Sequence, residues 1–111
     1  MVNVLYKREY EPHKLMQYSL TASGHAGYTE PGKDDIVCAS VSTLFYTLAN
    51  YLEQIGAEEL YADDSDEFRI ECKAFPNDDT VSTAFNMAVY GLYLLSESYP
   101  DNVTVDEDNG D

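Results

Sequence analysis

Positive charge is the scarcest property of this chain. Six lysines and arginines stand against 21 aspartates and glutamates, which gives a formal net charge of -15 at pH 7. A surface of this sign repels phosphate, which argues against direct binding of nucleic acid. Much of the acidic excess lies in residues 58–67 and 101–111. We expect it mainly to keep the chain soluble, with attraction of a basic partner as the alternative.

Long apolar runs and cysteines are scarce as well. No stretch reaches the roughly 20 apolar residues of a membrane span, and residues 1–8 lack the apolar core of a secretory signal. We therefore expect a cytoplasmic protein whose two cysteines, Cys38 and Cys72, are free thiols rather than a disulfide. With His13 and His25, they show none of the paired spacings typical of zinc sites, so we expect no metal and no cofactor.

The length allows one domain. At 111 residues the chain falls within the range of about 50 to 250 residues of single domains. A hydrophobic share of 44%, with ten tyrosines and four phenylalanines, indicates a folded core despite the charge. We assign residues 1–100 to the domain and 101–111 to an acidic C-terminal tail. Within the tail, 103–105 can add a short strand and 106–111 are expected to be disordered.

Two periodicities predict the fold. A period of two predicts strands over residues 2–10, 14–23 and 68–74, the first two antiparallel, and a shorter strand is expected over 59–62. Helical spacing predicts a first helix that is capped by Asp34 or Asp35 and ends at Gly56. It predicts a second helix that begins after the turn of residues 76–79 and ends at about Ser98. The stripe of the first helix consists of Val37, Val41, Leu44, Leu48, Leu52 and Ile55. The prediction is a single α+β domain of β-β-α-β-β-α order, with one sheet covered by two helices and Cys72 on the core side.

A glycine-containing loop joins His25, just beyond a predicted strand, to Cys38 on the first turn of the first helix. The amides and dipole of a helix N-terminus favour a thiolate, and a nearby imidazole can take its proton and return it to a leaving amine. The same amides can hold an oxyanion. Ser42 can direct its hydroxyl toward the thiol or a substrate, and Asp34 or Asp35 can orient His25, although capping is the simpler role. From the residues alone, Cys38 can equally be an ordinary buried thiol.

The surrounding residues resemble a known signature. The run Gly24-His25-Ala26-Gly27-Tyr28, then Gly32, and Asp35-Ile36-Val37-Cys38-Ala39 with Val41-Ser42 resemble the motif of the ribosomal-processing cysteine proteases, the Prp family. The resemblance implies a cysteine endopeptidase with Cys38 as nucleophile and His25 as general base. It further implies supporting or substrate-binding roles for Gly24, Gly27, Tyr28, Asp35 and Ser42. For Tyr28, substrate contact and pinning of the loop stay open.

The resemblance also implies a substrate and an assembly. Members are homodimers that remove a short N-terminal extension, ending in phenylalanine, from a large-subunit ribosomal protein, with a mobile loop over the cleft. Specificity is expected from an apolar pocket beneath the loop of residues 27–32. Two alternatives stay open: a phage-type protease that processes a capsid or scaffold protein, and a non-enzymatic acidic protein that binds a basic ribosomal partner.

Overall fold

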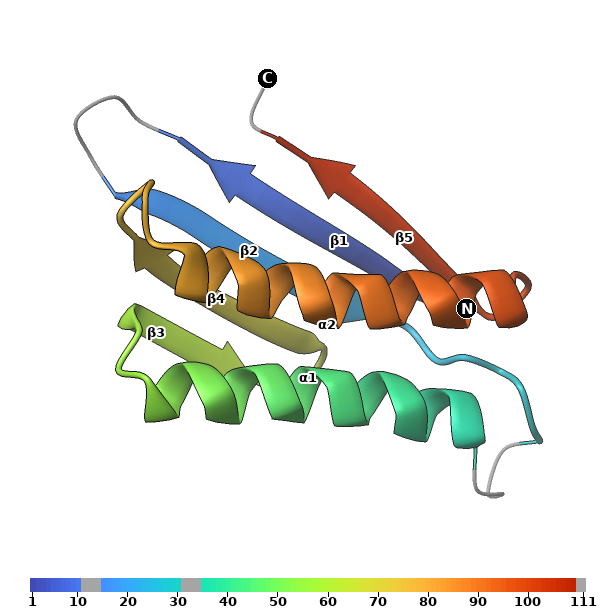
Figure 1. Ribbon diagram of the computed structural model, residues 1–111. Helices are drawn as coiled ribbons and strands as arrows, with labels where there is room; N and C mark the ends of the chain where they lie inside the picture. Colours follow the sequence, from blue (N-terminus) through green and yellow to red (C-terminus); the bar gives the residue numbers. More distant parts are fainter. Residues whose placement is uncertain (11–14, 31–34, 110–111) are drawn as a thin grey trace.

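The computed structural model describes residues 1–10, 15–30 and 35–109, which form one sheet with both helices on the same face (Figure 1). The strands lie in the order β3-β4-β2-β1-β5. This confirms the predicted α+β class and the β-β-α-β-β-α order, to which a fifth strand is added. The elements are β1 (Val2–Glu9), β2 (Met16–Ser23), α1 (Ile36–Gln54), β3 (Glu58–Asp63), β4 (Phe68–Ala74), α2 (Asp79–Ser98) and β5 (Val103–Asp108). Within the described ranges, no helix is long and apolar enough to cross a membrane.

The β1–β2 hairpin is antiparallel, as predicted, and its register sets the position of the site. Asn3 lies opposite Ser23, so the chain that leaves β2 emerges beside the start of β1. On the other side of β2, Tyr18 pairs with Cys72 of β4. Side chains alternate between the two faces of each strand, and Cys72 is fully buried on the helix-covered face, as expected.

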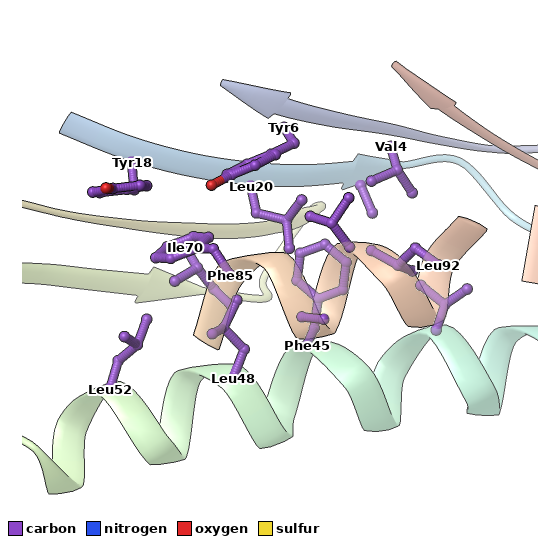
Figure 2. Close-up of a cluster of buried hydrophobic side chains, with 14 of the residues drawn as sticks. Val4, Tyr6, Tyr18, Leu20, Phe45, Leu48, Leu52, Ile70, Phe85 and Leu92 are labelled. Carbon is purple, nitrogen blue, oxygen red and sulfur yellow. The ribbon is translucent and has the colours of Figure 1, made fainter. Parts of the chain in front are cut away.

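The two helices close the core over the sheet. Figure 2 shows Phe45, Leu48 and Leu52 of α1 directed toward the sheet, with Phe85 of α2 among them. The Phe85 ring stacks on Tyr6, with ring centroids 5.8 Å apart. Four residues of the predicted stripe of α1 are therefore confirmed as buried: Val37, Val41, Leu48 and Leu52. Phe45 is buried, Leu44 faces Gly91 of α2, and Ile55 is exposed.

The C-terminal segment is more ordered than the sequence indicates. Residues 106–108, predicted to be disordered, belong to β5, which pairs in parallel with β1. Val103 is buried at the start of this strand. The acidic side chains are accommodated at the sheet edge, where Glu107 accepts a hydrogen bond from Tyr93 at 2.7 Å and lies 3.7 Å from Arg8. Backbone pairing with β1 does not depend on side-chain charge, so the acidic composition does not prevent a strand.

Candidate active site

Gly24 carries the chain off the end of β2 and positions His25. Its φ is +91°, and a Cβ at this position would lie 2.3 Å from the Met1 carbonyl oxygen, closer than any such contact allows. Glycine is therefore required both for its backbone angle and for its lack of a side chain. The following residue, His25, is exposed at the same end of the sheet as the N-terminus of α1.

Ala26 fixes the loop against the helix. It is buried, and its amide donates a hydrogen bond to Cys38 Sγ at 3.3 Å. Its carbonyl oxygen accepts one from Asn102 Nδ2 at 2.8 Å. An amide directed at the sulfur stabilises a thiolate more than a thiol, because a hydrogen bond to a charged acceptor is the stronger one. Asn102, which nothing in the sequence singled out, thus holds the residue next to His25.

Asp35 joins the same loop to α1 and is the helix cap, one of the two residues predicted for this role. Its Oδ1 accepts hydrogen bonds from the amides of Val37 at 2.9 Å and Cys38 at 3.0 Å, and its Oδ2 accepts one from the Tyr28 amide at 3.0 Å. These amides, that of Cys38 foremost, lower the pKa of the Asp35 carboxyl. Among the described residues, the hydrogen bonds of the Asp35 carboxylate go to backbone amides and none joins it to His25, and Asp34 lies outside these residues.

Because Asp35 accepts from both the loop and the helix, we expect Asp35→Ala to lower peptidase activity more than an equally destabilising change elsewhere. Asp78→Ala is the matched control, since Asp78 caps α2 through the Thr80 amide. Both variants should lower the melting temperature by several degrees, measured by thermal unfolding beside kcat/KM. The stabilisation from the Asp35 carboxylate should be complete above the ordinary aspartate pKa of about 3.9, and lost as pH falls through its lower folded-state pKa. Equal activity of the two variants would contradict the linking role.

One hollow of about 180 Å³ contains both predicted catalytic residues. Gly24 and His25 line it from the loop, and Cys38 and Ser42 line it from α1. Residues of the β3–β4 turn line it as well. Cys38 is partly buried and reaches this hollow. The structure therefore brings together the histidine and the cysteine on which the sequence prediction rests.

The two thiols differ sharply in their surroundings. Cys72 is fully buried in the core, and burial raises the pKa of its thiol to about 11. Cys38 Sγ instead accepts a hydrogen bond from the Ala26 amide, and Cys38 lines the hollow. Both are free thiols. Among the described residues, no three His, Cys, Asp or Glu side chains are grouped to hold a metal ion, and His13 is not among those residues.

Two details of the site differ from the sequence-based expectations. The Val37 and Cys38 amides, expected to hold an oxyanion, are occupied by Asp35. The Ser42 hydroxyl donates to the Cys38 carbonyl oxygen at 2.9 Å rather than to the thiol, a bond that helix geometry favours. The Tyr28 ring packs edge-on against Tyr99, with centroids 5.2 Å apart, a contact that can pin the loop, while contact of Tyr28 with substrate stays a prediction.

The expected apolar pocket beneath the loop also differs from the hollow observed. None of residues 27–30 lines it, and residues 31–34 lie outside the described part of the chain. The Tyr28 ring packs against Tyr99, and its amide donates a hydrogen bond to Asp35. Gly27 has a φ of +67° and no atom within 4 Å of an added Cβ, so its backbone angle favours glycine.

A histidine, a cysteine on the first turn of a helix and an amide directed at its sulfur are together typical of a cysteine peptidase. Comparison with known proteins gives the same class. The model of the family described as cysteine protease Prp matches residues 1–104, so the chain belongs to this family of cysteine peptidases.

Relatives of known sequence and structure cover nearly the whole chain. The ribosomal processing cysteine protease Prp of Mycoplasma genitalium is 28% identical over 95 residues, which are 86% of this chain and 93% of that protein. The crystal structure of SMU.848 from Streptococcus mutans is 30% identical with a TM-score of 0.69, covering 98% of this chain and 95% of that one. The crystal structure of the Staphylococcus aureus protease Prp with a covalently linked product peptide shares the fold, with a TM-score of 0.71 and 22% identity. The match covers 96% of this chain and 99% of that one.

Proposed function

We propose that Cys38 is the nucleophile and His25 the general base of this peptidase. The observation that carries the proposal is the Ala26 amide, 3.3 Å from Cys38 Sγ, in a loop whose preceding residue is His25 in the same hollow. The amide and the N-terminus of α1 both favour the thiolate. Exposure of His25 leaves its ring able to exchange protons with substrate and water.

The reaction would proceed in two steps. His25 takes the thiol proton, Cys38 Sγ attacks the scissile carbonyl carbon, and the C–N bond breaks as His25 returns the proton to the leaving amine. Water, deprotonated by His25, then attacks the thioester and releases the acid product. With the amides of Val37 and Cys38 held by Asp35, the Ala26 amide is the described donor beside the reacting sulfur. Because the sulfur loses its negative charge when it attacks, we propose that this amide then donates to the oxyanion instead. Protein groups alone supply these steps, without metal or cofactor.

For the substrate, we propose the N-terminal extension of a large-subunit ribosomal protein. The family match and the M. genitalium relative, a ribosomal processing protease, support this class of substrate. The S. aureus relative has been crystallised with a substrate peptide. Gly24, Gly27, Tyr28 and Ser42 would support the loop or the peptide. A substrate made on ribosomes would place the enzyme in the cytoplasm.

Mass spectrometry of a ribosomal protein precursor incubated with the enzyme tests this function. We expect one cut near the precursor N-terminus, absent with Cys38→Ala. Failure to cut, with Cys38 shown to be reactive, would contradict the ribosomal substrate and favour a phage structural protein. An unreactive Cys38 would favour the non-enzymatic binding protein.

We also propose a homodimer that forms through the outer face of the helices. A largely apolar groove of about 600 Å³ runs between α1 and α2, and Met87 beside it is 76% exposed. Tyr90 and Leu94 continue the exposed apolar stripe along α2. The charged residues of the two helices are only Glu53, Asp79 and Glu97. Two copies that each carry a charge of -15 would repel least where this face meets itself.

Met87→Glu should convert the dimer to a monomer, because it places like charges on both sides of the proposed interface. Phe75→Glu is the matched control, since Phe75 follows β4, is 64% exposed and does not line the groove. Light scattering after size-exclusion chromatography would measure the mass. A monomeric wild-type protein, or a dimeric Met87→Glu variant, would contradict the proposal.

A further inference from the structure

The active-site hollow carries negative charge beside the predicted catalytic pair. Asp64, Asp66 and Glu67, which we call the acidic wall, belong to the turn between β3 and β4 and line the same hollow as His25 and Cys38. No step of the proposed mechanism uses them. We infer that the acidic wall binds a lysine or arginine side chain of the peptide substrate close to the scissile bond, an inference that rests on the proposed peptidase function.

The first argument is position. A second hollow, of about 400 Å³, adjoins the first and shares Gly24, Asp66 and Glu67 with it. These three residues therefore lie between the reacting cysteine and a further space that can receive a side chain. A peptide whose carbonyl group reaches Cys38 has the wall directly beside it, so the wall contacts substrate rather than only solvent.

The second argument is the balance of charge. Among the described residues that line the first hollow, three are carboxylates and none is lysine or arginine. The second hollow contains Arg69, but Glu67 at 3.3 Å and Glu71 at 3.7 Å bind that guanidinium. The local charge is thus negative, and the walls of a hollow concentrate its field on whatever enters.

The third argument is that the wall is held in place and keeps one free acceptor. Asp64 accepts a hydrogen bond from the Tyr46 hydroxyl at 2.8 Å, which fixes one end of the turn. Glu67 is held by Arg69. Asp66 is exposed and has no partner within the described part of the chain. A cationic side chain would supply the partner that Asp66 lacks and would be stabilised by its two neighbours.

The charge beside Cys38 can be measured without peptide turnover. The thiol is modified with a cationic trimethylammonium-ethyl methanethiosulfonate and, separately, with its anionic sulfonatoethyl counterpart. We expect the rate with the cationic reagent divided by the rate with the anionic one to fall about tenfold in Asp66→Asn/Glu67→Gln. In the wild type, this ratio should fall with added salt. Glu53→Gln/Glu58→Gln removes two charges at the far end of α1, about 22 Å along the helix from Cys38, and should leave the ratio unchanged.

Paired peptides test the substrate itself. Each position around the cut carries lysine in one peptide and norleucine in the other, and kcat/KM is compared. At one position we expect about a tenfold preference for lysine that disappears in Asp66→Asn/Glu67→Gln and turns into a preference for norleucine in Asp66→Lys/Glu67→Lys. Equal cleavage of every pair by the wild type, or an unchanged preference in the neutral variant, would overturn the inference and leave the peptidase function standing. Absence of cleavage of all peptides would instead refute the proposed function and the inference with it.

Discussion

Replacing His25 with alanine is expected to lower kcat/KM for peptide cleavage by about 10²- to 10⁴-fold, the usual contribution of a general acid–base group. Without the imidazole, the thiol of Cys38 loses its proton acceptor and the leaving amine loses its proton donor. His25 is exposed and outside the core, so the melting temperature should change little. Steady-state kinetics with thermal unfolding of the same samples would separate the two effects.

The same variant should slow alkylation of Cys38 by iodoacetamide near neutral pH, because the thiol then lacks an imidazole to take its proton. His25→Ala with wild-type kcat/KM and an unchanged alkylation rate would remove His25 from the mechanism. A large loss of melting temperature would show that His25 has a structural role instead.

Gly24→Ala should lose both stability and activity. The added Cβ would lie 2.3 Å from the Met1 carbonyl oxygen, so the start of β1 or the end of β2 must move. Backbone strain of this kind costs on the order of 1–3 kcal/mol. Movement at Gly24 also displaces His25 and the Ala26 amide, so we expect kcat/KM to fall at least tenfold; a misplacement of about 1 Å can cost that much or more.

Gly56→Ala is the matched control for this loss. Gly56 has a φ of +70° after the end of α1, but an added Cβ there meets no atom within 4 Å. It should therefore cost stability through its backbone angle alone and leave kcat/KM unchanged. Urea denaturation would measure the unfolding free energy of both variants, and steady-state kinetics would measure their kcat/KM. Equal losses of unfolding free energy would contradict the steric argument at Gly24, and equal kcat/KM values would contradict its positioning role.

Local patterns predicted most of the fold because most of its elements have one buried and one exposed face. The alternation of Val2, Val4 and Tyr6 identified β1, and helical spacing identified α1 and α2. β5 was underestimated because its last three residues are acidic and its partner, β1, lies almost a whole chain length away. Leu44 packs against the core as predicted but is only partly buried, and part of its contact is with Gly91 of the neighbouring helix. Neither effect is visible in a short window of sequence.

The residues of the candidate site likewise include some that the sequence predicted and some that it did not. Asp35 was predictable as a cap, since a carboxylate before an apolar helical run has a local physical reason to be there. The Ala26 amide on Cys38 Sγ depends on how the loop folds back onto the helix. Asn102 supports that loop across 76 positions of sequence. An asparagine in the turn before β5 carries no local signal for such a role.

Charge was the least interpretable feature of the sequence. The acidic segment of residues 58–67 is compatible with solubility or with a basic partner, and composition cannot say which of its residues meet a substrate. The turn between β3 and β4 brings Asp64, Asp66 and Glu67 to the hollow that holds Cys38. Glu58 and Glu59, in the same segment, lie at the other end of β3. The fold thus separates acidic residues that the sequence groups together.

The central claim is that Cys38 is a nucleophile activated by its surroundings, and its alkylation rate tests this most directly. Peptide mass spectrometry would follow iodoacetamide labelling of Cys38 and Cys72 in the folded protein near neutral pH, beside His25→Ala and the urea-unfolded chain. We predict that Cys38 reacts at least tenfold faster than Cys72, whose thiol is buried with its pKa raised to about 11. The Cys38 rate should fall in His25→Ala, and the two cysteines should react alike once unfolded. A Cys38 as slow as Cys72, and unaffected by His25→Ala, would contradict the account.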